Sequence, residues 1–205
     1  METIILPAEH PSAISQALLT LHAGGLVAFP TDTVYGLGAL IRIPESITRL
    51  YTTKGRSKTK AIPVLLGDVD DLSQIAVRVP TNARRLAECF WPGPLTLVVP
   101  RHPSLPDILS PTATIGVRMP NHPIALDLLR RAGPLAVTSA NVSGQPSEST
   151  AEGVHEQLEG RISLIIDGGH TPGGSPSTVV HCTQTALVIL RLGPITETSL
   201  KAVLT

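Results

Sequence analysis

The sequence predicts an α/β or α+β fold in which helices cover a mixed sheet. Short apolar runs alternate with segments of helical periodicity early in the chain, and strand-like runs crowd together later. Glycine and proline number 17 and 19, more breakers than a helical bundle tolerates. Hydrophobic residues make up 42% and charged residues 16%, which is typical of a folded globular protein. We therefore expect residues 1–205 to form a single domain without an additional C-terminal domain.

Helices and strands alternate in the first part of the chain. An apolar stripe at helical spacing follows Ser12, a helix-capping residue, and stops at Gly24, which predicts a helix. The apolar run 26–29 then predicts a buried strand. Pro44 suits the first turn of a second helix, which ends near Gly55. Each element is short because a breaker residue soon follows it.

The same rhythm continues through residue 99. The run 62–66 predicts a strand, and Pro63 indicates an edge strand or the start of one. Residues 80–90 have helical periodicity, and a stiff Pro-Gly-Pro turn then leads into an apolar strand at 95–99.

The second half repeats this rhythm without repeating the sequence. The apolar patterns predict further strands and helices. Strands are expected at 114–118, 135–138, 162–166, 178–180 and 187–190, and helices at 122–132, 151–158 and 196–204.

Composition excludes several classes of protein. Lys and Arg together number 16, as do Asp and Glu, so no global field attracts nucleic acid. Cys89 and Cys182 are isolated, which favours free thiols in a reducing cytosol, and no Cys and His residues have the spacing of a zinc site. No signal peptide and no long apolar segment is visible. We expect a soluble cytoplasmic protein with no membrane partner.

The segment 30–38, PTDTVYGLG, follows a predicted buried strand and combines hydroxyls, a carboxylate and two glycines. Such a loop permits close approach of a polar ligand, although a plain turn is the alternative. A basic run at 54–60 contains four cations in seven residues; it suits phosphate binding or a solvated helix end. Arg118 ends an apolar strand, where a guanidinium suits either a carboxylate ligand or a structural ion pair.

Two further loops have the composition of ligand-binding segments. Residues 138–144, TSANVSG, offer hydroxyls and an amide at a strand end, and glycines recur at 168–169 and 173–174. No P-loop and no nucleophile-plus-histidine pattern is present. Groups that position anions without a nucleophile suit phosphoryl or nucleotidyl transfer.

Taken together, these strings resemble the YrdC-like threonylcarbamoyl-AMP synthase family. The matching motifs, in order, are PTDTVYGLG at 30–38, KGRS at 54–57, WPGPLTL at 91–97, GVRMP at 116–120, TSANVSG at 138–144, DGG at 167–169 and STVV at 177–180. The resemblance covers about residues 12–193, and the chain looks like a short member of that family.

The resemblance implies a fold and an activity. Family members fold as a twisted mixed sheet with helices around an open, positively lined, concave cavity. They condense L-threonine, bicarbonate and ATP into threonylcarbamoyl-adenylate and release pyrophosphate, with Mg²⁺ neutralising the triphosphate. A second enzyme transfers the product to tRNA as threonylcarbamoyladenosine, and a direct contact of this chain with tRNA stays open.

The resemblance also implies roles for individual residues, with no covalent nucleophile and no metal ligand among them. The expected ATP-binding residues are Lys54 and Arg56, which also act electrostatically, with Lys60, Ser139, Asn141, Ser143 and Arg191. The expected threonine-binding residues are Thr31, Tyr35, Arg118, Thr138 and Ser177. Arg118 would pair with the threonine carboxylate, whereas Asp32 would either order its loop or help position magnesium.

Two other functions use the same fold. An RNA-binding or ribosome-maturation module is disfavoured by the balanced charge and by the aromatic content of 2%, which leaves little for base stacking. A carbamoyl-adenylate-forming domain, as in hydrogenase-maturation proteins, belongs to much longer chains whose acylphosphatase and zinc-finger parts are missing here.

Overall fold

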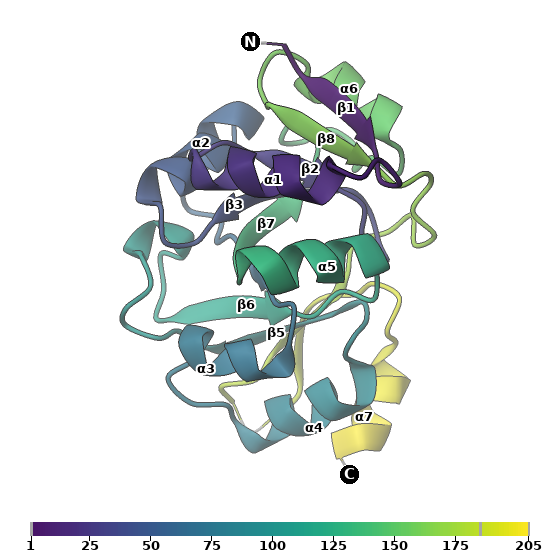
Figure 1. Ribbon diagram of the computed structural model, residues 1–205. Helices are drawn as coiled ribbons and strands as arrows, with labels where there is room; N and C mark the ends of the chain where they lie inside the picture. Colours follow the sequence, from purple (N-terminus) through teal and green to yellow (C-terminus); the bar gives the residue numbers. More distant parts are fainter. Residues whose placement is uncertain (1, 185, 205) are drawn as a thin grey trace.

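The computed structural model describes residues 2–184 and 186–204, which form one mixed ten-stranded sheet flanked by helices (Figure 1). The strand order is β1-β8-β2-β3-β7-β4-β6-β5-β9-β10. The pairs β1/β8, β2/β8, β4/β6 and β5/β9 are parallel and the other pairs are antiparallel. The predicted α/β class with a mixed sheet is therefore confirmed.

The strands are β1 (Ile4–Pro7), β2 (Val27–Phe29), β3 (Gly36–Leu40), β4 (Val64–Leu65), β5 (Leu95–Pro100), β6 (Thr114–Arg118), β7 (Leu135–Ser139), β8 (Leu164–Asp167), β9 (Thr178–His181) and β10 (Val188–Arg191). The α-helices are α1 (Ala13–His22), α2 (Pro44–Lys54), α3 (Leu72–Ile75), α4 (Thr81–Phe90), α5 (Pro123–Ala132), α6 (Ala151–Leu158) and α7 (Glu197–Leu204). None of the helices in the described ranges has the length and apolarity needed to cross a membrane.

The ends of the helices follow from their sequences. Pro44 occupies the first turn of α2, and Gly55 ends that helix in the left-handed conformation, with φ of 61°. Thr150 caps α6 because its hydroxyl accepts a hydrogen bond from the Gly153 N–H at 3.2 Å. The expectation for Ser12 was wrong in one respect: it precedes α1, but its side chain makes no capping bond.

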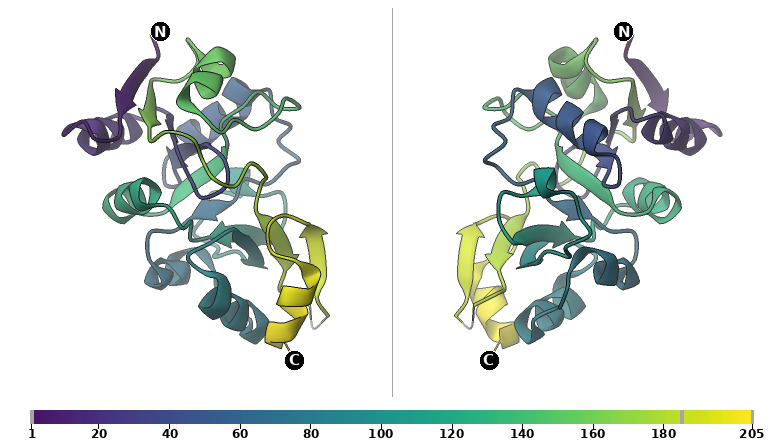
Figure 2. Two further views of the ribbon diagram at one scale, coloured as in Figure 1. Left: turned by 90° about the vertical axis from the view of Figure 1, so that its right-hand side faces the viewer. Right: turned by 90° about the vertical axis from the view of Figure 1, so that its left-hand side faces the viewer.

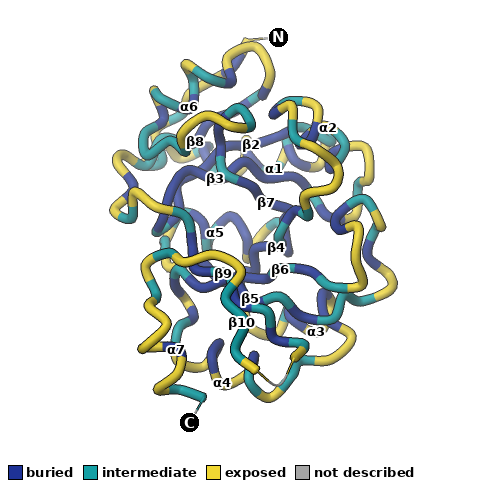
Figure 3. The backbone as a smooth tube through the Cα atoms, turned by 180° about the vertical axis from the view of Figure 1, so that it is seen from behind, coloured by how far each residue is buried: buried dark blue, intermediate teal, exposed yellow. Residues whose placement is uncertain are grey.

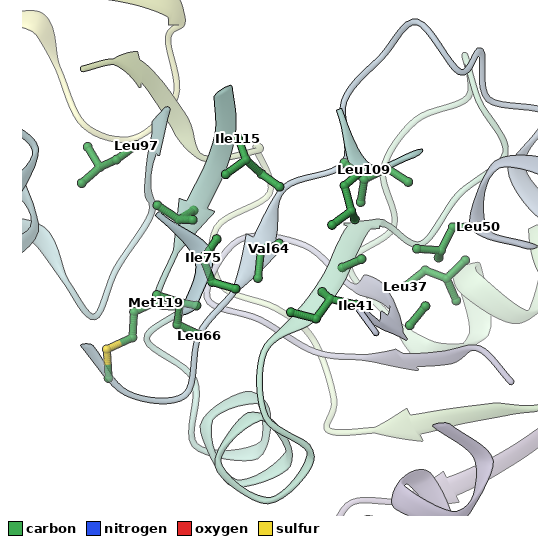
Figure 4. Packing of buried hydrophobic residues seen from close by; sticks show 14 of the residues in the cluster. Leu37, Ile41, Leu50, Val64, Leu66, Ile75, Leu97, Leu109, Ile115 and Met119 are labelled. Carbon is green, nitrogen blue, oxygen red and sulfur yellow. The ribbon is translucent and has the colours of Figure 1, made fainter. Parts of the chain in front are cut away.

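Alternate residues along the strands build the core. One cluster joins Leu37, Val64 and Leu97 to side chains of α2 and α3, and Figure 4 shows Leu50 and Ile75 packed with them. A second cluster packs the opposite faces of β2, β4 and β7 against α1 and α5. Burying one large aliphatic side chain contributes about 1.5–3 kcal/mol, so these clusters fix the positions of the strands. Figure 3 shows the buried residues concentrated along the central strands.

Three details differ from the sequence prediction. Residues 36–40 form β3 rather than the end of a loop, and their glycines serve packing: a Cβ at Gly36 would lie 2.8 Å from Cγ1 of Val137. β4 begins directly after Pro63, as expected for a strand start, but it lies in the middle of the sheet and not at an edge. β1 was missed because it is short, mostly exposed and paired only with β8.

The two termini lie at opposite ends of the molecule, as Figures 1 and 2 show. β1 forms one edge of the sheet and β10 forms the other. Both cysteines, Cys89 and Cys182, are free thiols, as the sequence predicted.

Candidate functional site

A cavity of about 520 Å³ opens on the central strands of the sheet. Residues of β4, β5, β6, β7 and β9 line it, together with the loop before β3 and the loop after β7. Gly116 and Thr96 lie next to each other in the cavity lining, and a Cβ at Gly116 would lie 3.1 Å from Cγ2 of Thr96. The absence of a side chain at Gly116 therefore keeps this part of the cavity floor open. The volume falls in the range of small-molecule sites, which is about 300–1,000 Å³.

The cavity is strongly positive although the chain as a whole is balanced. Five cationic residues line it: Lys54, Arg56, Lys60, Arg118 and Arg191. Among the described residues that line it, none is Asp, Glu, His or Cys. A cleft with one sign of charge attracts ligands of the opposite sign, so the cavity suits an anion.

Arg118, at the end of β6, is held by two segments, the turn before β5 and the loop before β3. Its Nε donates to the Gly93 carbonyl at 3.0 Å and its Nη1 to Oγ1 of Thr33 at 3.1 Å. Its Nη2 forms an ion pair with Asp32. The sequence left open whether Asp32 orders its loop or helps position magnesium; in this structure Oδ1 of its carboxylate pairs with Arg118.

Lys54, the last residue of α2, is 2% exposed. Its ammonium group donates to the main-chain carbonyls of Ser139 and Asn141, and lies 3.3 Å from Oδ1 of Asn141. In return, the Ser143 N–H donates to the Lys54 carbonyl at 2.8 Å. In this structure protein oxygens take up the three N–H directions of Lys54, and the expectation that Lys54 binds phosphate stays a prediction. Lys54 clamps the loop after β7 to the end of α2.

Burial and the neighbouring Arg56 lower the pKa of Lys54 to about 7. The guanidinium of Arg56 is itself only partly buried, and its Nη2 donates to the Ala61 carbonyl at 2.8 Å. Burial is also the main cause that lowers the pKa of Arg56. Lys60 lines the same wall of the cavity and is exposed.

Arg191, at the end of β10, completes the positive wall. Its Nε donates to the Ser177 carbonyl at 3.0 Å and its Nη2 to Oγ of Ser177 at 3.2 Å. Oγ of Ser177 also lies 2.8 Å from Oγ1 of Thr96. Burial lowers the pKa of Arg191, and the charge of Arg56 lowers it further. Ser177 thus holds Arg191 in place, and its expected contact with threonine stays a prediction.

The end of β7 and the loop after it present free hydroxyls to the cavity. Thr138, Ser139 and Ser143 all line it, and within the described part of the chain their hydroxyls make no hydrogen bond. The Asn141 amide, by contrast, is used inside the loop, where Nδ2 donates to the carbonyls of Val142 and Gln145 at 2.8 and 2.7 Å. Three hydroxyl donors are therefore available to a ligand.

The loop before β3 is mostly bonded to itself and to its neighbours. Oγ1 of Thr31 donates to the Val34 carbonyl at 2.6 Å and accepts from the Thr33 N–H at 3.2 Å. The Tyr35 hydroxyl donates to the Gly169 carbonyl at 2.8 Å. Burial raises the pKa of Tyr35 to about 12, so this hydroxyl stays a donor at neutral pH. In this structure both hydroxyls are bonded to main-chain carbonyls, and the expected threonine contacts of Thr31 and Tyr35 stay predictions.

Thr33 and Thr96 are cavity residues that the sequence prediction missed. Both lie inside motifs that it had singled out, so a signal was present. What was missing was the direction of each side chain. Among the described residues, no group of three or more His, Cys, Asp and Glu could hold a metal ion. Because Mg²⁺ requires oxygen ligands and is usually held by carboxylates, the cavity walls do not fit a protein-bound magnesium.

The mixed sheet carries a cationic cavity with free hydroxyls and an anchored guanidinium. These features define the class of the chain, an α/β protein whose cavity suits an anionic small molecule. Comparison with known proteins narrows this class. The family model Sua5–YciO–YrdC, described as "Telomere recombination", matches residues 19–193. The chain belongs to this family, and the family relationship expected from the sequence motifs is confirmed.

The relatives agree with this assignment. The chain is 43% identical over 197 residues to a threonylcarbamoyl-AMP synthase of Bacillus subtilis, covering 93% of this chain and 56% of that protein. It is 38% identical over 199 residues to a putative threonylcarbamoyl-AMP synthase of Mycobacterium tuberculosis, covering 97% and 92%. The chain thus spans little more than half of one relative and most of the other.

Solved structures show the same fold. Pyrococcus abyssi Sua5 complexed with L-threonine superposes with a TM-score of 0.94 at 39% identity, over 98% of this chain and 61% of that one. Escherichia coli YciO gives a TM-score of 0.86 at 28% identity, over 97% and 98%. A nucleotide-bound HypF, at 22% identity and a TM-score of 0.76 over 87% of this chain and 28% of that one, shares the fold alone.

Proposed function

We propose that this protein condenses L-threonine, bicarbonate and ATP into threonylcarbamoyl-adenylate and releases pyrophosphate. The observation that carries the proposal is the cavity, which is lined by five cations and no carboxylate. Both ATP and the carboxylate of threonine are anions, and the P. abyssi relative binds L-threonine. The names of the relatives point to the same reaction.

In this reaction the threonine amine takes up carbon dioxide from bicarbonate, forming a carbamate. A carbamate oxygen then attacks the α-phosphorus of ATP as the bond to pyrophosphate breaks. We assign Arg118 to the threonine carboxylate, and Arg56, Lys60 and Arg191 to the phosphates. Charge that builds up on the leaving pyrophosphate would be stabilised by these fixed cations, which is the main source of catalysis in such transfers.

The end of β7 and the loop after it would bind the ligands through the hydroxyls of Thr138, Ser139 and Ser143. Lys54 and Asn141 would hold that loop, because their own polar groups are already bonded within it. A covalent nucleophile would need a base beside it, and none of the described lining residues is His, Asp or Glu. We therefore assign no residue as a nucleophile. Any Mg²⁺ would enter bound to the ATP phosphates, with no ligand from the cavity.

The product is a reactive mixed anhydride, so we propose that a second enzyme uses it to modify adenosine in tRNA as threonylcarbamoyladenosine. The cytoplasm, where tRNA and all three substrates occur, is the compartment in which we place this activity. Contact with tRNA itself is not needed for the step proposed here.

Pyrophosphate release from purified protein tests the proposal. We expect release that requires ATP, bicarbonate and L-threonine together, and a product with the mass of threonylcarbamoyl-adenylate. Loss of one charged hydrogen-bond donor costs about 1.5–3 kcal/mol, so Arg191→Gln should raise the KM for ATP about tenfold or more. Arg131→Gln removes an exposed arginine that pairs with Asp127 outside the cavity, and it should leave the KM unchanged.

Each competing function gives a different result in this assay. Release that does not depend on threonine would contradict the proposal. A carbamoyl-adenylate-forming domain would join carbamate itself to the α-phosphate of ATP, so it would release pyrophosphate without threonine. A module that only binds RNA would release none.

A further inference from the structure

Asp32 lies behind the cavity rather than in it. Its side chain is 11% exposed and that of Arg118 is 7% exposed, so the ion pair between them is buried. Arg118 lines the cavity whereas Asp32 does not. Oδ2 of Asp32 is buried and has no partner among the described residues, so the carboxylate touches the site only through Arg118.

The contacts of Arg118 leave part of its guanidinium available. Of its five N–H groups, one is taken by Gly93, one by Thr33 and one by Asp32. No other acceptor within the described ranges contacts it, so one N–H on each terminal nitrogen is left. A guanidinium recognises a carboxylate through two parallel hydrogen bonds, which require that its plane be fixed.

The loop that carries Asp32 is itself fixed. The Thr31 hydroxyl bridges to Val34 and Thr33 inside the loop. The segment before β9 packs directly on its outside, because a Cβ at Gly173 would lie only 2.6 Å from the Asp32 carbonyl oxygen and 2.7 Å from Cα of Thr33. Asp32 is therefore a rigid anchor, and Gly173 allows the close approach that keeps it so.

We propose that Asp32 is a positioning residue, which fixes the Arg118 guanidinium so that its two remaining N–H groups select a carboxylate on the amino-acid substrate. This inference rests on the proposed function. Asp32 neutralises part of the charge of Arg118, so selection would depend on the direction of the N–H groups more than on net attraction. A role as a base or as a metal ligand would need Asp32 to reach the cavity, which it does not.

The test compares L-threonine with L-threoninamide, which keeps the amine and the hydroxyl but replaces the carboxylate by a neutral amide. The readout is the ratio of kcat/KM for the two substrates, measured by pyrophosphate release, together with the KM for ATP. In the wild-type protein we expect a strong preference for threonine. Asp32→Ala should reduce this preference at least about tenfold, the effect of 1.4 kcal/mol, while the KM for ATP stays within about twofold.

Further variants separate position from charge and from stability. Asp32→Asn keeps an oxygen acceptor for Nη2, so it should retain the preference to within about threefold. Thr33→Val removes the second anchor at nearly constant shape, and it should lower the preference several-fold. Asp107→Ala breaks an exposed ion pair with Arg101 outside the cavity and serves as the matched control, with no change expected.

The outcomes are distinct. A folded Asp32→Ala variant that keeps the wild-type preference for threonine would overturn the inference. An Asp32→Asn variant that loses as much of this preference as Asp32→Ala would also overturn it, because the charge of Asp32 would then be what matters. If Asp32→Ala does not fold, as loss of one partner of a buried ion pair can cause, a wild-type preference in Thr33→Val overturns the inference and a reduced one supports it. Absence of threonine-dependent release in the wild-type protein would refute the proposed function, and calorimetric binding of the two compounds would then decide the inference separately.

Discussion

Replacement of Lys54 by methionine distinguishes the two roles that this residue can have. Methionine has nearly the same length and fills the same space, but it donates no hydrogen bond. If Lys54 clamps the loop after β7, the substitution leaves the Asn141 carbonyl without its donor, while the Ser139 carbonyl keeps the Asn141 N–H at 3.0 Å. If Lys54 is only a phosphate ligand, the protein without ATP should not need it.

The expected size of the effect follows from the contacts. Each buried acceptor left without a donor costs about 1–3 kcal/mol. The substitution also removes a cation that is buried beside Arg56, and both burial and Arg56 disfavour the charged form of Lys54. Removal of this unfavourable charge offsets part of the cost of the unsatisfied acceptor. We therefore expect Lys54→Met to lower the free energy of unfolding by about 1–3 kcal/mol in the absence of any ligand.

Urea unfolding of the protein without ATP measures this quantity. Lys60→Met is the matched control, since Lys60 lines the same cavity but is exposed; its unfolding midpoint should not change, although its KM for ATP should rise. An unfolding midpoint of Lys54→Met equal to that of the wild-type protein, or higher, would refute the clamp and restore Lys54 to the phosphates.

Four other measurements probe the same site. The pKa of Lys54 in the fold, about 7, lies below that of a lysine in an unfolded chain, 10.5. Between these pH values the unfolded chain therefore binds more protons than the folded protein, so the wild-type protein gains stability as the pH rises. The free energy of unfolding of the wild-type protein minus that of Lys54→Met should rise from pH 7 to pH 10 in urea titrations. A difference that does not change with pH would contradict this prediction. Tyr35→Phe leaves the Gly169 carbonyl without its donor and should cost about 1–3 kcal/mol of stability in thermal unfolding, yet leave the KM for threonine unchanged. Inorganic pyrophosphate should raise the melting temperature, by the equivalent of about 2.7 kcal/mol at a hundred times its Kd, and added salt should weaken the effect. Gly116→Val fills the cavity floor beside Thr96 and should lower the affinity for ATP, measured by calorimetry, about tenfold or more.

The sequence located the loops of the site but not the partners of their side chains. Arg118 could be picked out because it ends an apolar strand, where a guanidinium needs an anion, whereas Arg191 was expected only from the family resemblance. The hydroxyls of the loop after β7 could be picked out because they follow a strand directly. Their position at the cavity follows from the alternation of side chains along a strand.

The protein partners of Lys54 and Arg118 escaped prediction for one physical reason. Lys54 bonds to a carbonyl 85 residues away, and Arg118 pairs with a carboxylate 86 residues away. Such pairs depend on which strands lie side by side, and the sheet order places β7 next to both β3 and β4. Motif composition cannot distinguish a lysine that meets a phosphate from one that meets a carbonyl, because both are oxygen acceptors.

The placement of the two termini at opposite ends of one sheet has a mechanical consequence. A force that stretches the chain by its ends runs across the strands from β1 to β10, and the cavity-lining strands stand in the middle of that path. A ligand that contacts both Arg118 on β6 and Arg191 on β10 would link two of the strands that carry the force. This added link would resist separation of the strands. Pulling single molecules by their ends would then report occupancy of the cavity as an increase in rupture force.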